Sequence, residues 1–175
     1  MRTTEREQDY APIAAELDAL LKPSLQDYQP RTPQPEKRPW QLSYQVFVAF
    51  FGGVLSATLV AYLNGRALRL SRNQLLAILA AGLVGFLATI VVTLLLGRAS
   101  MPEFLSPGDA TTLASRAIAL LTFLAFYRLQ KPADRVYAFF GGEYGSILPV
   151  GLMAIFGLGF VQWLLVKMIV AALAG

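Results

Sequence analysis

Residues 44–97 read YQVFVAFFGGVLSATLVAYLNGRALRLSRNQLLAILAAGLVGFLATIVVTLLLG and decide the fold. No Asp, Glu, Lys or Arg occurs in 45–63 or in 75–96. Each uncharged run is long enough to cross a hydrocarbon core of about 30 Å as a helix. The stretch between them, 64–74, is polar and rich in arginine, which suits a short turn. The sequence therefore predicts a membrane-spanning helical hairpin.

The composition of the whole chain extends this prediction. Of 175 residues, 55% are hydrophobic, and the mean hydropathy is +0.52. Such values are typical of a multi-pass membrane protein and exceed those of soluble domains. We expect an all-α, multi-pass transmembrane helical bundle over 41–175 with four spans, at about 44–64, 75–97, 111–128 and 147–170.

The first 40 residues are predicted to lie outside the membrane. Residues 9–22 suit a short amphipathic helix capped by Asp9, which either rests on a surface or forms a frayed tail. Residues 23–39 carry five prolines among polar side chains, a composition typical of an extended linker. The chain begins with polar residues of mixed charge, and this pattern does not predict a signal peptide. Domain 1–40 is therefore expected to be an extramembrane helix on a Pro-rich tether.

Small residues recur at every fourth position along the first two predicted spans, which places each series on one helix face. Such faces let helix backbones approach closely in lipid. We predict that the two helices pack along them, with Gly53 and Ala57 against Ala81 and Gly85. The predicted packing residues are Ala49, Gly53, Ala57, Ala61, Ala77, Ala81, Gly85 and Thr89.

Charged side chains interrupt the later spans. Arg116 lies in the first third of the third span, and Lys167 lies near the end of the fourth. Both side chains are long enough to reach an interface, which favours snorkelling over a buried functional charge. The charge of Arg116 also leaves open a re-entrant or surface helix in place of the third span. Asp109 is expected to cap the start of that span.

Several short motifs resemble those of a known group. They are Phe-Phe-Gly-Gly at 50–53, Leu-Asn-Gly-Arg at 63–66, Tyr-Arg-Leu-Gln at 127–130 and Gly-Gly at 141–142. In this order they resemble uncharacterised small four-span bacterial membrane proteins. The resemblance implies a bacterial inner (cytoplasmic) membrane and no particular activity.

The chain offers little for catalysis or ligand chemistry. It has no His and no Cys, and its predicted spans have no carboxylate, so we predict no cofactor, no metal site and no enzymatic activity. Ser146 follows a glycine, but no residue type near it would activate a nucleophile. Polar span residues such as Gln162 and Thr122 are expected to make interhelical hydrogen bonds. Because the basic residues adjoin predicted spans, we expect lipid and not nucleic acid as their partner.

Basic residues near the spans give the expected orientation. Four lie on one side: Arg31, Lys37, Arg38 and Arg98. Six lie in two loops on the other side and are predicted to contact anionic lipid: Arg66, Arg69, Arg72, Arg128, Lys131 and Arg135. Because basic loops favour the cytoplasm, this count predicts that both termini lie outside. The absence of a signal sequence before a charged tail opposes that arrangement.

Two classes of function fit these features. The first is an integral membrane structural or interaction protein, an accessory subunit or scaffold that packs against another membrane protein through small-residue helix faces. The alternative is a small oligomeric transport or permeation protein. It would not be coupled to protons through intramembrane carboxylates, because the predicted spans have none. The sequence favours the first class and leaves the oligomeric state open.

Overall fold

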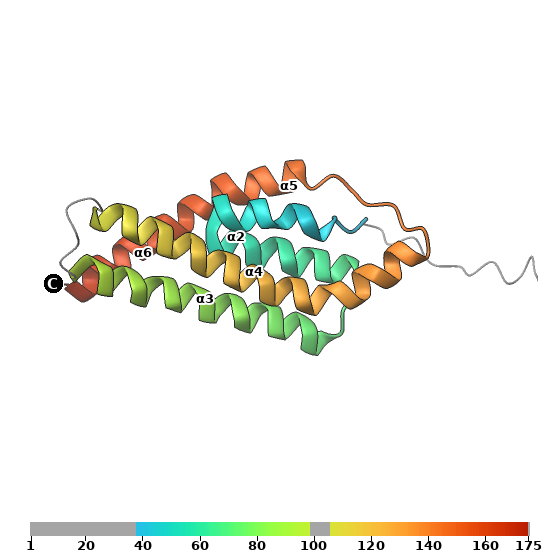
Figure 1. Ribbon diagram of the computed structural model, residues 1–175, viewed down its shortest axis with the longest axis horizontal. Coiled ribbons are helices and arrows are strands. Elements are labelled where there is room, and N and C mark those ends of the chain that lie inside the picture. The colour runs from blue at the N-terminus through green and yellow to red at the C-terminus, as the bar shows by residue number, and fades with distance from the viewer. Residues whose placement is uncertain (1–37, 99–105, 175) are drawn as a thin grey trace, which may run out of the picture. The chain divides into compact units, whose positions relative to one another are not determined.

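Residues 38–98 and 106–174 are described by the computed structural model (Figure 1). The predicted helix at 9–22 and residues 23–37 of the Pro-rich tether lie outside these residues. The described elements are the 3-10 helix η1 (Leu42–Tyr44), the α-helices α2 (Gln45–Ala67), α3 (Arg72–Arg98), α4 (Pro107–Phe139), α5 (Leu148–Met153) and α6 (Gly159–Ala174), and the π-helix η2 (Ala154–Leu158).

The described residues confirm the all-α class of a membrane protein. Four segments are long and apolar enough to cross a membrane: Leu42–Ala67, Arg72–Arg98, Pro107–Phe139 and Leu148–Leu173. Length and composition therefore agree with the predicted number of membrane segments. The path of the first segment through the bundle does not follow from its length.

The helix α2 is folded back on itself at Gly53, where the backbone has φ 76° and ψ −167°. Trp40 and Asn64 are 24 residues apart, and a straight helix would separate them by about 36 Å. Instead, the backbone N–H of Trp40 donates to Asn64 Oδ1 at 2.6 Å. Figure 1 shows the two limbs of α2 side by side. The straight crossing predicted over 44–64 is therefore replaced by a re-entrant hairpin, residues 42–67.

Neither limb of the hairpin can cross a bilayer alone. The first limb (42–52) and the second limb (54–67) extend about 17 and 21 Å at 1.5 Å per residue, against a core of about 30 Å. Val48 of the first limb and Val60 of the second lie in the same buried cluster, which a straight helix would not allow. Glycine suits the turn because a residue with a Cβ rarely adopts the positive φ of Gly53.

The last three elements form one continuous helical rod. A Cβ on Gly151 would contact Val48, and one on Gly159 would contact Gly52. The rod therefore runs in the same direction as the first limb of the hairpin. Figure 1 shows that it continues past the hairpin turn to the opposite end of the bundle.

The re-entrant hairpin changes where the described chain begins and ends. The hairpin returns to its starting end, α3 leaves that end, α4 comes back, and the last rod leaves again (Figure 1). We call the end that holds Trp40 and Asn64 the open end, and the end that holds Arg98 the far end. Residue 38 is at the open end and residue 174 at the far end. This differs from the four-span expectation, in which both termini share one side.

Close packing joins the second limb of the hairpin to α3 and α4. A Cβ on Gly82 would overlap the Thr58 side chain, and one on Gly85 would overlap Thr122 and lie 3.1 Å from Val54 Cγ1. Glycine at these two positions of α3 therefore lets the helices approach closely. The main core cluster, drawn from three helices, contains Ala49, Ala57, Ala61, Ile78, Phe123 and Phe126.

The helix α4 is capped by Ser106, whose Oγ accepts the backbone N–H of Asp109 at 3.1 Å. The cap is therefore Ser106, and the expected cap, Asp109, lies in the first turn. The Asp109 carboxylate accepts a hydrogen bond from the Ser106 hydroxyl at 2.6 Å. Its negative charge also interacts favourably with the positive N-terminal end of the helix dipole. With 33 residues, α4 is about 50 Å long and exceeds the thickness of a membrane core. Its charged last third therefore extends beyond the apolar layer at the open end.

Candidate functional site

The turn of the hairpin lies against α6. The turn interrupts the helix, and backbone polar groups that are freed within a membrane need hydrogen-bond partners in the protein. Gln162 supplies one such partner. Its Oε1 accepts the backbone N–H of Leu55 at 2.8 Å, and its side chain is only 8% exposed. Leu55 lies in the first turn of the second limb, where N–H groups lack intrahelical partners. Gln162 therefore caps this helix from a neighbouring one.

Ser56 connects the hairpin turn to the π-helical part of the last rod. Its Oγ lies 2.8 Å from the carbonyl oxygen of Gly52 and 2.7 Å from that of Ala154, so its single hydrogen is shared between two acceptors. Ala154 begins η2, and π-helical turns recur at functional sites. A Cβ on Gly159 would lie 3.3 Å from the Gly52 carbonyl oxygen, so the two backbones touch. We call this unit the tip site: Gly52, Gly53, Leu55, Ser56, Ala154 and Gln162.

A positive charge lies beside the tip site. The guanidinium carbon of Arg116 on α4 lies 4.9 Å from the ring centroid of Phe50, near the end of the first limb. The contact is a cation–π interaction between the guanidinium group and the ring face. The Arg116 side chain is exposed. Lys167, the other intramembrane cation, is also exposed, on α6.

A second polar cluster lies at the open end. Asn64 accepts the Trp40 N–H and donates its Nδ2 to Gln130 Oε1 at 2.8 Å. Asn64 and Gln130 are both 0% exposed. Among the residues that the structure describes, the amide nitrogens of Gln130 and of the buried Gln45 have no hydrogen-bond partner. Sequence reasoning assigned no role to these three amides, although amide side chains at the ends of uncharged runs are a usable signal of buried contacts.

The predicted packing residues are distributed over more than one contact. Ala49, Ala57 and Ala61 are buried in the main cluster, and Ala81 packs against it. Ala77 is half-buried, and Thr89 is buried with its hydroxyl bonded to the Gly85 carbonyl of its own helix. Gly85 lies against Val54 and Thr122, and Gly53 lies against Gln162. Ala57 and Ala81 therefore belong to the same region of the core, whereas Gly53 lies against Gln162 of α6.

The six residues predicted to contact lipid all lie at the open end. They occupy the last turn of α2, the connection to α3, the start of α3 and the last third of α4. Five are exposed, and the half-buried Lys131 lies with its ammonium 5.0 Å from the ring centroid of Tyr127. Arg38 joins them at this end and forms an ion pair with Glu143 at 2.9 Å. The predicted residues therefore share one surface.

The connection 140–147 supports the entrance of the hairpin. Gly145 donates its N–H to the Pro39 carbonyl at 2.9 Å, and the Tyr144 hydroxyl donates to Asp134 Oδ1 at 3.0 Å. Burial, followed by the hydrogen bond and charge of Asp134, raises the pKa of Tyr144 to about 12. Tyr144 therefore stays protonated as a donor at physiological pH.

The remaining candidates for chemistry have structural partners. The Ser146 Oγ accepts the backbone N–H of Leu148 at the start of α5. Within 38–98 and 106–174, no group of three or more acidic, His or Cys side chains is placed to hold a metal ion. No known protein family, curated protein or solved structure matches the chain. A functional proposal therefore depends on the tip site and on the open end.

Proposed function

We propose that the protein is an integral membrane interaction protein, an accessory subunit or scaffold of a bacterial inner membrane. The tip site carries this proposal. A transport path through the hairpin would need polar backbone groups that face an unfilled space. Here the Leu55 N–H is taken by Gln162, and the Ala154 carbonyl is taken by Ser56.

The packing around the hairpin supports the same proposal. Glycines of α3 touch Thr58, Val54 and Thr122 directly. The hydroxyls of Thr58 and Thr122 bond to carbonyls of their own helices at 2.7 and 2.8 Å. Their polar groups are therefore satisfied locally, as in a dry seam between helices. A hairpin held in this way serves as a fixed part of the fold, and a partner would bind the outer faces or the N-terminal segment.

Arg116 favours a second function, the permeation of anions. Charged side chains within membrane segments mark ion pathways by default, and arginine attracts anions. Arg116 is exposed and contacts the ring of Phe50, three residues before Gly53 of the hairpin turn. An assembly of several copies would be needed to enclose a path along this surface.

Two measurements on the full chain separate these functions. Purification in mild detergent followed by native mass spectrometry should show a second membrane protein in a fixed stoichiometry. Proteoliposomes that contain the purified protein should show no chloride flux above protein-free vesicles. Chloride flux that falls in R116Q but not in K167Q would overturn the interaction proposal in favour of permeation.

A further inference from the structure

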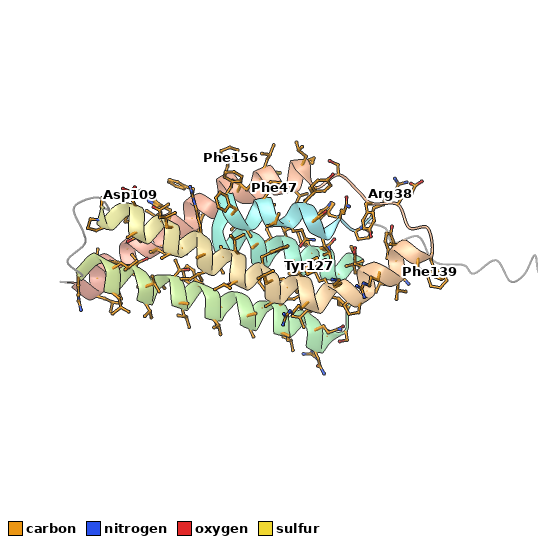
Figure 2. The ribbon with its side chains drawn as sticks, in the orientation of Figure 1. Arg38, Phe47, Asp109, Tyr127, Phe139 and Phe156 are labelled. Atoms are coloured by element: carbon orange, nitrogen blue, oxygen red, sulfur yellow. The ribbon has the colours of Figure 1, made fainter. Side chains whose placement is uncertain are left out.

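Positive charge is distributed unequally between the two ends of the bundle. Six basic residues lie at the open end in two groups, Arg66, Arg69 and Arg72 before and at the start of α3, and Arg128, Lys131 and Arg135 on α4. Arg38 adds a seventh, in an ion pair with Glu143. The far half of the bundle holds three basic residues, Arg98, Arg116 and Lys167. Figure 2 shows Arg38 at the open end and Asp109 at the far end.

The re-entrant hairpin is what gathers these charges. If α2 crossed the membrane, Arg38 and the basic residues that precede it in the sequence would lie opposite the two basic loops. The bond between Trp40 and Asn64 instead holds the start of the hairpin beside its end. Of the four residues that opposed the six in the sequence count, Arg38 therefore joins the six at the open end, and Arg98 stays at the far end.

We propose that the open end faces the cytoplasm and that its basic residues bind the anionic headgroups of the cytoplasmic leaflet. Basic residues close to membrane segments are retained in the cytoplasm, and the asymmetry here is larger than in a four-span arrangement. The N-terminal segment then stays in the cytoplasm and needs no translocation. Residue 174, at the far end, lies on the outer side of the membrane.

The arrangement of the basic residues suits a lipid surface. Arg128 and Arg135 are exposed on the part of α4 that extends past the apolar layer, and the side chains of Arg66 and Arg72 are exposed at the same end. Lys131 lies over Tyr127, an aromatic residue of the kind that occurs at headgroup level. Phosphate groups of anionic lipids are the acceptors that arginine recognises at such a position.

Labelling of single cysteines in intact cells tests the orientation, since the native chain has no Cys. Asn73 lies at the open end, and Gly108 lies at the far end, where a Cβ would make only an ordinary contact of 3.7 Å. A membrane-impermeant maleimide should label G108C in intact cells and label N73C only after permeabilisation. Labelling of N73C but not of G108C in intact cells would overturn the proposal.

The retention of anionic lipid tests whether the basic residues at the open end bind lipid headgroups. The full-length protein is incubated with vesicles of phosphatidylglycerol and phosphatidylcholine, extracted, and examined by native mass spectrometry. The triple variant R128Q/K131Q/R135Q should lose about tenfold or more in apparent affinity for phosphatidylglycerol. The control R98Q/K167Q, which removes two charges from the far half, should keep the wild-type affinity for phosphatidylglycerol. Equal loss in both variants, or release of the lipid by millimolar inorganic phosphate, would overturn a lipid site at the open end.

Discussion

The helices α2 and α3 are nearly alike as sequences and different as structures. Both are long and uncharged in the middle, and the most apolar 18-residue stretch of each has a mean hydropathy of 2.1 in 42–67 and 2.7 in 72–98. Both carry small residues at every fourth position. Yet α3 is a continuous helix, whereas α2 turns back at Gly53 and returns to the end from which it came.

The difference follows from two features. The first is the adjacent pair Gly52 and Gly53, since α3 has no two adjacent glycines (Gly82, Gly85 and Gly97) and keeps a regular backbone. The second is the position of polar side chains. Asn64 and Ser56 of α2 bond to other elements, whereas Thr89 of α3 bonds to a carbonyl of its own helix. Hydropathy therefore predicts that a segment enters the membrane but does not predict whether it crosses.

The largest expected effect comes from removing the glycine at the hairpin turn. In G53L, the positive φ costs about 1–3 kcal/mol, and the new Cβ would also lie 2.8 Å from the Gln162 amide. We expect a loss of about 3 kcal/mol or more in unfolding free energy, measured by denaturation in detergent. The matched control is G97L in α3, where a Cβ meets nothing within 4 Å. Equal stability of the two variants would contradict the hairpin turn.

A smaller effect is expected where α3 contacts the hairpin. In G85L, the side chain would enter the space held by Thr122 and Val54. Overpacking of this kind costs about 1–3 kcal/mol in unfolding free energy. The control V84L enlarges an exposed neighbour on the same helix and should leave stability nearly unchanged. The contact is misassigned if V84L destabilises the protein as much as G85L does.

Removal of Gln162, the cap on the second limb, should lower the unfolding free energy by as much as G85L does or by less. In Q162L, the Leu55 N–H loses its partner in a buried site, which costs about 1–3 kcal/mol. The control T93V removes a hydroxyl that bonds to the Thr89 carbonyl of its own helix, so its effect should be smaller. Hydrogen exchange at Leu55 should also rise in Q162L. Unchanged exchange there would show that Gln162 is not the cap.

The smallest effect concerns the support of the hairpin entrance. The pKa of Tyr144 is raised to about 12, so its neutral form is favoured by folding. The stabilisation of the fold by neutral Tyr144 is complete below the ordinary tyrosine pKa of about 10 and is lost as pH rises through 12. An ultraviolet difference titration of wild type against Y144F should give a midpoint near 12. D134N should lower that midpoint, and an unshifted midpoint in D134N would contradict the role of Asp134.

The sequence predicts the class of the fold because hydrophobic runs have direct energetic meaning in lipid. The ends of α3 fall within three residues of the predicted span 75–97. Ser106 replaces Asp109 as the cap of α4 because both residue types suit an N-cap, and the local backbone decides between them. Such differences are small and local.

The hairpin could not be predicted in the same way. Its turn depends on contacts with residues more than 100 positions away, such as the bond from Leu55 to Gln162. Gln162 was expected to bond between helices, but its partner was not evident from spacing. The small-residue pattern of α2 suggested one straight face, whereas Ala49 and Ala57 meet across the turn in one cluster. A periodic pattern therefore gives the same prediction for a straight helix and for two short limbs.

The relative positions of Ser24 and Asn73 test the re-entrant hairpin most directly. The two residues flank 42–67 in the sequence, and each can be replaced by the only Cys of the chain. An impermeant maleimide is applied to inverted and to right-side-out membrane vesicles of S24C and N73C. A re-entrant hairpin predicts that both variants react in the same kind of vesicle. Reaction of S24C in one kind and of N73C in the other would show that α2 crosses the membrane and would contradict the account.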